Sequence, residues 1–522
     1  MTQPPGSQYP AQGAGRGRAG AGDPPSPSAA GTVPIPIAFS GVAWVEGPLL
    51  AVRGVEGVGW DEIARVRLPS GEIRAGLVLE VHRDVAVVEV LQGTGGIDPE
   101  RASVAFEGRP FDIPVGEGWL GRVWNGMGEP LDGGPPMLSG ERRAVAGAPL
   151  NPTERDVPSD PVFTGISVID ALMTLVRGQK LPVFSSAGLP HLELAAQIAA
   201  QANAGGESFK VVVAAMGLTH ADAAAIVQAL ETRSAAGDLV LVLDTADDPV
   251  VQRILTPRVA LTIAEHLAFE RQHHVLVVLA DMTSYCEAVR EVSAARGEIP
   301  GRRAYPGYLY SDLASIYERC GRVRGRPGSI TQVPVLTMPG GDITHPVPDL
   351  TGYITEGQIV LSPERHAEGV YPPVDVLSSL SRLMRKGAGP GRTRGDHLAL
   401  AGQLVAALAL ARAAQELADL IGMEALTETD RQYLAFNDAF SHDLVNQDMD
   451  ESRTLKDTLD RAWQVLSILP ERELTMVPAA DIATYYLGDH LGREQHEPVS
   501  GAPRSPASDQ PATEPEGEVP YA

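Results

Sequence analysis

A strand–turn–helix segment occupies the place where a phosphate-binding loop would stand. KLPVFSS (180–186) has the pattern of a buried strand, and HLELAAQIAAQANA (191–204) that of a helix. A working loop between two such elements reads G-x-x-x-x-G-K-[ST]: its amides surround the phosphates, its lysine contacts them and its hydroxyl binds Mg²⁺. In that register the chain has Ser185, Ser186, Ala187, Gly188, Leu189, Pro190, His191 and Leu192.

Each departure from the motif removes one physical function. Ser185 replaces the first glycine, so the backbone loses access to positive φ. Pro190 has no N–H to donate to a phosphate oxygen. His191 replaces the lysine, and Leu192 has no hydroxyl for Mg²⁺. We therefore expect no ATP hydrolysis at this loop. On these residues alone, a turn that never bound phosphate is an equally good interpretation.

The surrounding segments predict an α/β domain over residues 109–385. The apolar runs KVVVAAM, DLVLVLD and HHVLVVLAD are each followed by a segment with helical periodicity. Strands that are apolar throughout indicate a parallel sheet covered by helices on both faces. In the third unit, Thr256 is expected to cap a helix with Pro257 at its first position.

Two further domains and two tails flank this core. Residues 35–108 contain short apolar alternations broken by glycine, such as LLAVRGV and VAVVEVLQG, which predict a small β-barrel. Residues 386–489 have helical periodicity and predict a helical domain. The segments 1–34 and 490–522 are of low complexity, the second rich in proline and acidic residues, and are expected to be disordered.

The composition excludes some classes of function. The net charge of −24 argues against a groove for DNA or RNA, which needs clustered lysine and arginine. The apolar stretch AGQLVAALALARAA (401–414) is interrupted by Arg412 and is too short to span a bilayer. We expect a soluble protein that reaches a membrane only through partners. The histidines show no metal-binding pattern, so no residue is assigned as a metal ligand.

Four long segments resemble the B subunits of V-type and archaeal-type rotary ATPases. They are FSSAGLPHLELAAQIA (184–199), IPGRRAYPGYLYSDLASIYERCGRV (299–323), GSITQVPVLTMPGGDITHPVPDLTGYITEGQIVLS (328–362) and YPPVDVLSSLSRLM (371–384). The GLPH in place of GxGKT marks these B subunits. The resemblance runs from about residue 35 to 488, and it implies a RecA-like core between a barrel and a helical domain.

The resemblance also implies an assembly. The B subunit alternates with catalytic A subunits in an A3B3 hexamer on the cytoplasmic face of a membrane. The hexamer surrounds a central shaft, is held by peripheral stalks and is coupled to a ring that carries protons or sodium. ATP or ADP with Mg²⁺ would lie at the A–B interface, held mainly by A, and B would be the non-catalytic, regulatory partner that supports ATP synthesis or hydrolysis.

Individual residues follow from the resemblance. Arg382 matches the arginine that B extends into the neighbouring A site, and Ser381 and Tyr353 lie near the same face. Tyr353 either borders adenine or packs between subunits, and packing is the favoured interpretation. Gly217 stands where catalytic relatives carry the glutamate that polarises water. Asp281 stands where the fold places a magnesium-associated carboxylate, although a strand-end aspartate without a catalytic role is favoured.

Two alternatives share this core. A catalytic A-type or flagellar-export-type subunit would need the loop residues and the glutamate that are missing here. An A-type subunit would also need a large insertion, for which residues 108–160 leave no room. A ring-shaped RNA translocase is disfavoured by the negative charge and by the lack of an aromatic and basic strand-binding surface.

Overall fold

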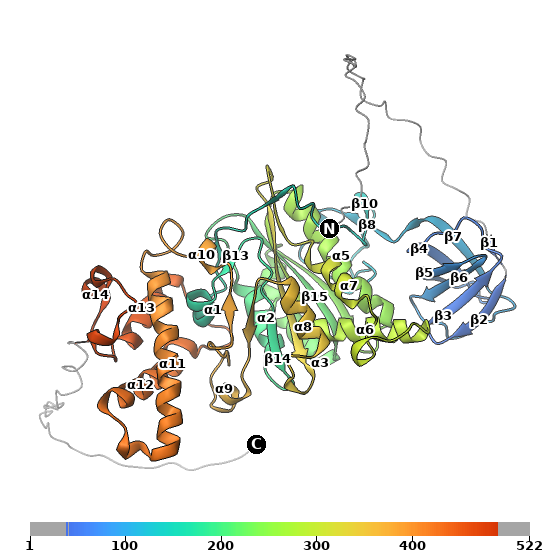
Figure 1. The fold of residues 1–522 in the computed structure, drawn as a ribbon. Coiled ribbons are helices and arrows are strands. Elements are labelled where there is room, and N and C mark those ends of the chain that lie inside the picture. The colour runs from blue at the N-terminus through green and yellow to red at the C-terminus, as the bar shows by residue number, and fades with distance from the viewer. Residues whose placement is uncertain (1–37, 40, 489–522) are drawn as a thin grey trace, which may run out of the picture.

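The computed structural model describes residues 38–39 and 41–488. The predicted tails, 1–34 and 490–522, lie outside the described residues. The described chain forms a β-barrel, a central α/β domain and a helical domain, arranged in this order along one axis (Figure 1). The three parts confirm the predicted fold class.

The barrel is one antiparallel sheet with the strand order β1-β7-β4-β5-β6-β3-β2. The strands β1 and β2 are the two edges of this sheet, yet only two residues of chain separate them. The sheet must therefore curl until its edges adjoin, which makes a barrel. Residues such as Val66, Val78, Val88 and Val104 fill its interior. The strands are β1 (Ala38–Phe39), β2 (Val42–Glu46), β3 (Leu49–Arg53), β4 (Glu62–Arg67), β5 (Ile73–His82), β6 (Val85–Val90) and β7 (Ser103–Pro110).

The central sheet has the order β21-β20-β14-β19-β17-β15-β16-β9, and all neighbours from β20 to β9 are parallel. The edge strand β21 is antiparallel to β20. The strands are β9 (Arg122–Asn125), β14 (Val183–Ser186), β15 (Phe209–Leu218), β16 (Leu239–Thr245), β17 (His274–Ala280), β19 (Ser329–Met338), β20 (Gly357–Val360) and β21 (Leu380–Ser381). The strand β9 was not expected, because the turn signals around it mask its short apolar pattern.

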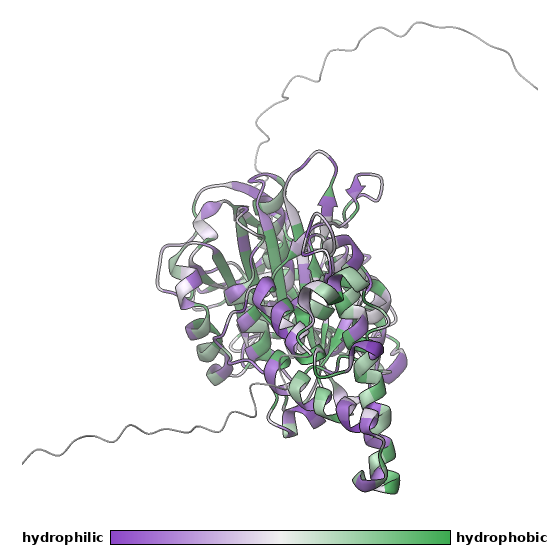
Figure 2. Cartoon of the chain, turned by 90° about the vertical axis from the view of Figure 1, so that its left-hand side faces the viewer, coloured by the Kyte–Doolittle hydropathy of each residue, from purple (hydrophilic) through white to green (hydrophobic). Residues whose placement is uncertain are grey.

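Helices cover both faces of this sheet. Val211, Val213 and Ala215 of β15 belong to the apolar cluster that includes residues of α2 (His191–Gln201) and α3 (His220–Ala229). The alternate residues Val212 and Ala214 belong to the cluster formed with α5 (Val250–Phe269), α6 (Met282–Ala295) and α7 (Leu309–Tyr317). The central strands are largely hydrophobic along their length (Figure 2). This arrangement confirms the parallel sheet with helices on both faces.

The predicted start of α5 is wrong. The helix begins at Val250 after Pro249, so Pro257 lies in its interior. Thr256 does not cap the helix but donates a hydrogen bond from its hydroxyl to the Gln252 carbonyl oxygen at 2.8 Å. An interior proline costs a helix roughly 3 kcal/mol. The extensive burial of α5 between the sheet and the neighbouring helices offsets this cost.

The C-terminal domain consists of helices. They are α11 (His397–Ile421), α12 (Glu428–Ala439), a π-helical segment (Phe440–Val445), α13 (Leu455–Leu466) and α14 (Ala479–Tyr485). By length and composition alone α11 could cross a membrane, so the expectation that its apolar stretch is too short is wrong. One face of α11, with Leu400, Leu404 and Leu408, is buried in the apolar cluster that it shares with α12 and α13. We therefore identify α11 as a core helix of this domain.

The remaining elements connect these parts. A two-stranded sheet of β8 and β10 follows the barrel, and β12 pairs with β13. The short strand β18 pairs antiparallel with the first residues of β19, and β11 pairs with β18. The bounds are β8 (Asp112–Val115), β10 (Glu141–Ala144), β11 (Arg155–Asp156), β12 (Pro161–Val162), α1 (Ser167–Leu172), β13 (Leu175–Val176), α4 (Glu231–Ala235), β18 (Gly321–Val323), α8 (Pro346–Ile354), α9 (Pro363–Ala367) and α10 (Met384–Gly387).

Candidate functional site

Two backbone amides of the turn between β14 and α2 donate to carbonyl oxygens within the turn. The Leu189 amide donates to the Ser186 carbonyl oxygen at 3.3 Å, and the His191 amide donates to the Leu189 carbonyl oxygen at 2.8 Å. The Nδ1 atom of His191 is also 2.8 Å from the Leu189 carbonyl oxygen, which fixes the imidazole against the turn. Only Gly188, at φ 83°, keeps the left-handed conformation of a glycine-rich loop. Two amides are turned inward, His191 stands in place of the lysine and Leu192 in place of the hydroxyl residue, so this turn does not fit a magnesium-bound nucleotide.

Asp281 follows β17 and caps α6. Its carboxylate accepts hydrogen bonds from the Thr283 amide at 2.7 Å and from the Thr337 hydroxyl at 2.7 Å. Burial raises the pKa of the Asp281 carboxyl, although these bonds favour its ionised form. Both oxygens are therefore engaged in joining β17, α6 and β19. Within residues 38–39 and 41–488, no three histidine, cysteine, aspartate or glutamate residues are grouped to hold a metal ion.

Gly217 lies next to a buried ion pair that the sequence did not reveal. Its amide donates to Oδ2 of Asp244 at 2.9 Å, and Nε of Arg253 donates to the same oxygen at 2.7 Å. Burial raises the pKa of Asp244 to about 6, against the opposing effects of Arg253 and the Gly217 amide. A Cβ atom on Gly217 would lie 3.0 Å from Nε of Arg253 and 3.0 Å from Cβ of Ser284. The structure thus has no room for a glutamate in this backbone conformation.

Arg382 is exposed and lies at the end of β21, the antiparallel edge strand. Its amide donates to the Glu356 carbonyl oxygen at 3.0 Å, and its Nη1 donates to the Thr355 carbonyl oxygen at 3.2 Å. Thr355 and Glu356 were not singled out in the sequence, although they directly precede β20. The carbonyl oxygens of these two residues orient Arg382, and its side chain is otherwise exposed to solvent.

Ser381 directly precedes Arg382, and Tyr353 lies two residues before Thr355, whose carbonyl Arg382 binds, but the two differ in their surroundings. The Ser381 hydroxyl accepts from Nε2 of Gln179 at 2.9 Å and lies 3.3 Å from the Thr174 carbonyl oxygen, so it is used within the fold. Tyr353 is 75% exposed on α8, two residues before the carbonyl that Arg382 binds. Of the two neighbours, only Tyr353 presents a side chain that another molecule can cover.

The strand register separates Arg382 from the turn at the end of β14. Arg382 is bound to Glu356, and the Glu356 amide donates to the Lys180 carbonyl oxygen. Ser186 lies six residues further along this segment, at the opposite end of β14. At about 3.3 Å per residue, Ser186 lies roughly 20 Å along the strand direction from Lys180, the residue level with Arg382. Arg382 therefore cannot act on a ligand in this chain's own turn.

Comparison with known proteins gives the same three-part organisation. Residues 42–108 match the beta-barrel domain of the ATP synthase alpha/beta family, and residues 165–381 match its nucleotide-binding domain. Residues 386–486 match the C-terminal domain of V and A type ATP synthase. The chain is 54% identical over 450 residues to the B subunit of the A-type ATP synthase of Aeropyrum pernix, covering 86% of this chain and 97% of that protein. The chain belongs to the family of A-type ATP synthase B subunits.

A solved structure supports this assignment. The ATP synthase subunit NeqB from Nanoarcheaum equitans superposes with a TM-score of 0.64 at 36% identity, covering 80% of this chain and 98% of that one. The family resemblance found in the sequence is thereby confirmed. As a member of the family, the chain is a head subunit of a rotary ATP synthase and works as part of a complex.

Proposed function

We propose that this B-family chain is the non-catalytic, regulatory subunit of an alternating A3B3 hexamer, and that Arg382 completes the nucleotide site of a neighbouring A subunit. Two independent features of the chain support this division of roles. The first is the turn after β14, whose inward amides, Pro190, His191 and Leu192 do not suit phosphate binding. The second is the position of Arg382 on an exposed edge far from that turn.

The chemistry of Arg382 suits the proposed role. Guanidinium stays charged at all physiological pH values, and its planar fork can contact two phosphate oxygens at once. The residue therefore stabilises negative charge that develops on a γ-phosphate during transfer. Comparable arginines supplied in trans accelerate GTP hydrolysis by about 10³- to 10⁵-fold. The single observation that carries the proposal is the exposed guanidinium, held at its base by the Thr355 carbonyl.

The proposal includes the partners and the place of the complex. ATP or ADP with Mg²⁺ binds at the A–B interface, where A supplies the phosphate loop. The other partners are a central shaft, peripheral stalks and an ion-carrying membrane ring, with no nucleic acid. The chain lies at the cytoplasmic face of the membrane through these partners. The exposed Tyr353 packs against the neighbouring subunit or the adenine.

The test compares two arginines of the same segment in a reconstituted A–B complex. We expect Arg382→Ala to reduce ATP turnover by at least about 10³-fold while native mass spectrometry still shows the hexamer. Arg385→Ala removes an exposed charge three residues away and should leave turnover within about twofold of the unaltered complex. Near-normal turnover with Arg382→Ala would disprove the proposed role of this residue. ATP hydrolysis by the purified chain alone would instead disprove its non-catalytic status.

A further inference from the structure

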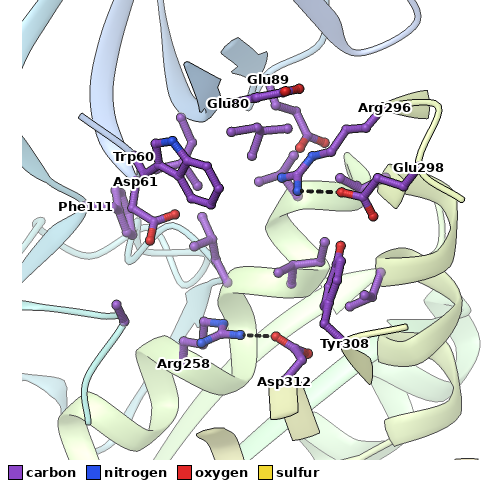
Figure 3. Close-up of a pocket in the computed structure, with 18 of the residues that line it drawn as sticks. Trp60, Asp61, Glu80, Glu89, Phe111, Arg258, Arg296, Glu298, Tyr308 and Asp312 are labelled. Atoms are coloured by element: carbon purple, nitrogen blue, oxygen red, sulfur yellow. Dashed lines mark hydrogen bonds and ion pairs between the residues drawn. The ribbon is translucent and has the colours of Figure 1, made fainter. Parts of the chain in front are cut away.

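A large cavity lies between the barrel and the central domain, away from the strand ends described above. Its volume is about 780 Å³, which is within the range of small-molecule sites. The barrel contributes Trp60, Asp61 and Leu79 to the lining, and the central domain contributes residues of α5 and the end of α6 (Figure 3). Trp60 is 71% exposed and Ile299 is 91% exposed, so apolar side chains from both domains border the entrance.

Glu89 of β6 lies in the wall of this cavity. Its neighbours Val88 and Val90 point into the barrel, so Glu89 points outward, beside Leu77 on the paired strand. The residue is 0% exposed, and neither carboxyl oxygen has a hydrogen-bond partner among the described residues. A buried polar group without a partner is costly, and native proteins almost always supply one. Nε of Arg296, whose charge favours the ionised form of Glu89, is also buried without a hydrogen-bond partner among the described residues. The carboxyl group therefore lacks a hydrogen bond that a bound molecule could supply.

The charges around the cavity favour a cationic partner. Two arginines in the lining are already paired: Nη2 of Arg258 lies 2.6 Å from Oδ1 of Asp312, and Nη1 of Arg296 lies 3.4 Å from Oε1 of Glu298 (Figure 3). Three acidic side chains remain, those of Asp61, Glu80 and Glu89. No ion pair within residues 38–39 and 41–488 involves any of these three. The cavity lining thus contains more carboxyl groups than arginines. Asp61 and Glu89 lie within electrostatic reach of Arg258 and Arg296, respectively. Burial raises the pKa of Glu89 to about 8, so its carboxyl group is protonated near neutral pH until a cation binds.

We propose that this cavity binds an amphipathic organic cation. Its charge pairs with the Glu89 carboxylate, which releases its proton to solvent on binding, and its apolar body lies against Leu79, Ile254 and Val292. The cation enters between Trp60 and Ile299. The face of Trp60 favours a cation at the entrance as well, because an indole ring attracts positive charge. An anion is disfavoured by the three carboxyl groups. A neutral ligand can form a hydrogen bond with Glu89 but carries no charge to offset Asp61 and Glu80.

The test uses a matched pair of fluorescent probes on the full chain. Dansylcadaverine carries an ammonium group on an alkyl chain, whereas N-pentyl dansylamide has the same body without the charge. Titration of each probe, followed by the blue shift of dansyl emission, gives its dissociation constant. We expect the cationic probe to bind at least about tenfold more tightly than the neutral one, a difference of roughly 1.4 kcal/mol.

Substitutions then locate the bound charge. Glu89→Gln keeps the shape of the side chain and should abolish the preference for the cationic probe. Glu416→Gln removes a 71% exposed carboxylate from the distant helix α11 and should leave the preference unchanged. Circular dichroism checks that each variant is folded, and Glu80→Gln replaces Glu89→Gln if the latter does not fold. Equal affinity for the two probes, absence of binding at millimolar concentration, or an unchanged preference in the Glu89 variant would each overturn the proposal.

Discussion

Arg382 reaches the carboxyl end of α8, where its Nη1 donates to the Thr355 carbonyl oxygen at 3.2 Å. The carbonyls at a helix end carry partial negative charge, so this contact favours a cation. The next residue, Glu356, accepts the Arg382 amide and is itself bound to Lys180, whose Nζ lies 3.0 Å from Oε1 of Glu356. Lys180 is buried, so its ion pair with Glu356 fixes the position of Thr355 and Glu356 relative to the core. Arg382 is thereby oriented although it is exposed.

This contact predicts that lysine cannot replace arginine at position 382. Arg382→Lys keeps the positive charge but loses the planar fork that would reach both the Thr355 carbonyl and a phosphate. We expect ATP turnover of the reconstituted complex to fall by about 10- to 100-fold, less than for Arg382→Ala, with little change in KM for ATP. Steady-state kinetics on the two variants side by side measure this. Equal turnover of the lysine variant and the unaltered complex would contradict a role for the fork.

Gly217 predicts a stability defect that is specific to its position. At φ 68° and with Arg253 and Ser284 each 3.0 Å from an added Cβ, Gly217→Ala should lower the free energy of unfolding by about 1–3 kcal/mol. Gly352→Ala is the control, because an added Cβ there has nothing within 4 Å. As Gly352 lies in α8, this change should be neutral or stabilising by up to about 1 kcal/mol. Urea denaturation compares the two, and equal effects would refute strain at Gly217.

The burial of the Glu89 carboxyl group predicts that the stability of the chain depends on pH. Burial raises the pKa of this group from 4.5 to about 8. Below pH 4.5 the carboxyl group is protonated in both the folded and the unfolded chain, so it causes no penalty. As pH rises from 4.5 towards 8, only the unfolded chain loses the proton, and the folded state is destabilised by up to about 5 kcal/mol. Above about pH 8 both states are ionised and the penalty stays constant.

The measurement for Glu89 is a difference between two proteins. The stability of Glu89→Gln minus that of the unaltered chain, measured by urea denaturation, should increase between pH 5 and pH 8. Glu416→Gln, with an exposed carboxylate, should show no such increase. A difference that is flat with pH would show that Glu89 is ionised in the folded chain throughout this range.

Arg319 predicts the largest loss of stability among these changes. It is 1% exposed and binds Glu265 through Nε at 2.6 Å and Nη2 at 2.8 Å, while Nη1 donates to the Val145 carbonyl oxygen. Arg319→Met leaves the Glu265 carboxylate without its cation and should cost about 3–5 kcal/mol. Arg412→Met, at an exposed pair 3.7 Å from Glu416, should cost less than about 1 kcal/mol. Thermal unfolding of the two variants measures this. Similar losses of stability in Arg319→Met and Arg412→Met would contradict a larger contribution from the buried pair.

Much of the fold was predictable because its signals are local. The apolar strands of the central sheet, the glycine-broken alternation of the barrel and the periodicity of α11 each lie within a few consecutive residues. The loss of lysine and hydroxyl at His191 and Leu192 can likewise be recognised from side-chain chemistry alone. Long stretches around these residues were enough to indicate the family, which the comparisons confirmed.

Other features depend on contacts between distant parts of the chain. Pro257 signals a helix start locally, but burial of α5 places it in the helix interior. Glu89 alternates like a surface residue on β6, and only packing of the barrel against α6 buries it.

The sequence by itself determined which side chains are present and which elements they form. The tertiary structure decided where Arg382 lies relative to the turn after β14. Because β14 pairs parallel with β20 and β21 runs antiparallel to β20, Arg382 and the turn after β14 lie at opposite ends of one sheet. Strand register is set by hydrogen bonds between segments far apart in the chain, so no local pattern specifies it.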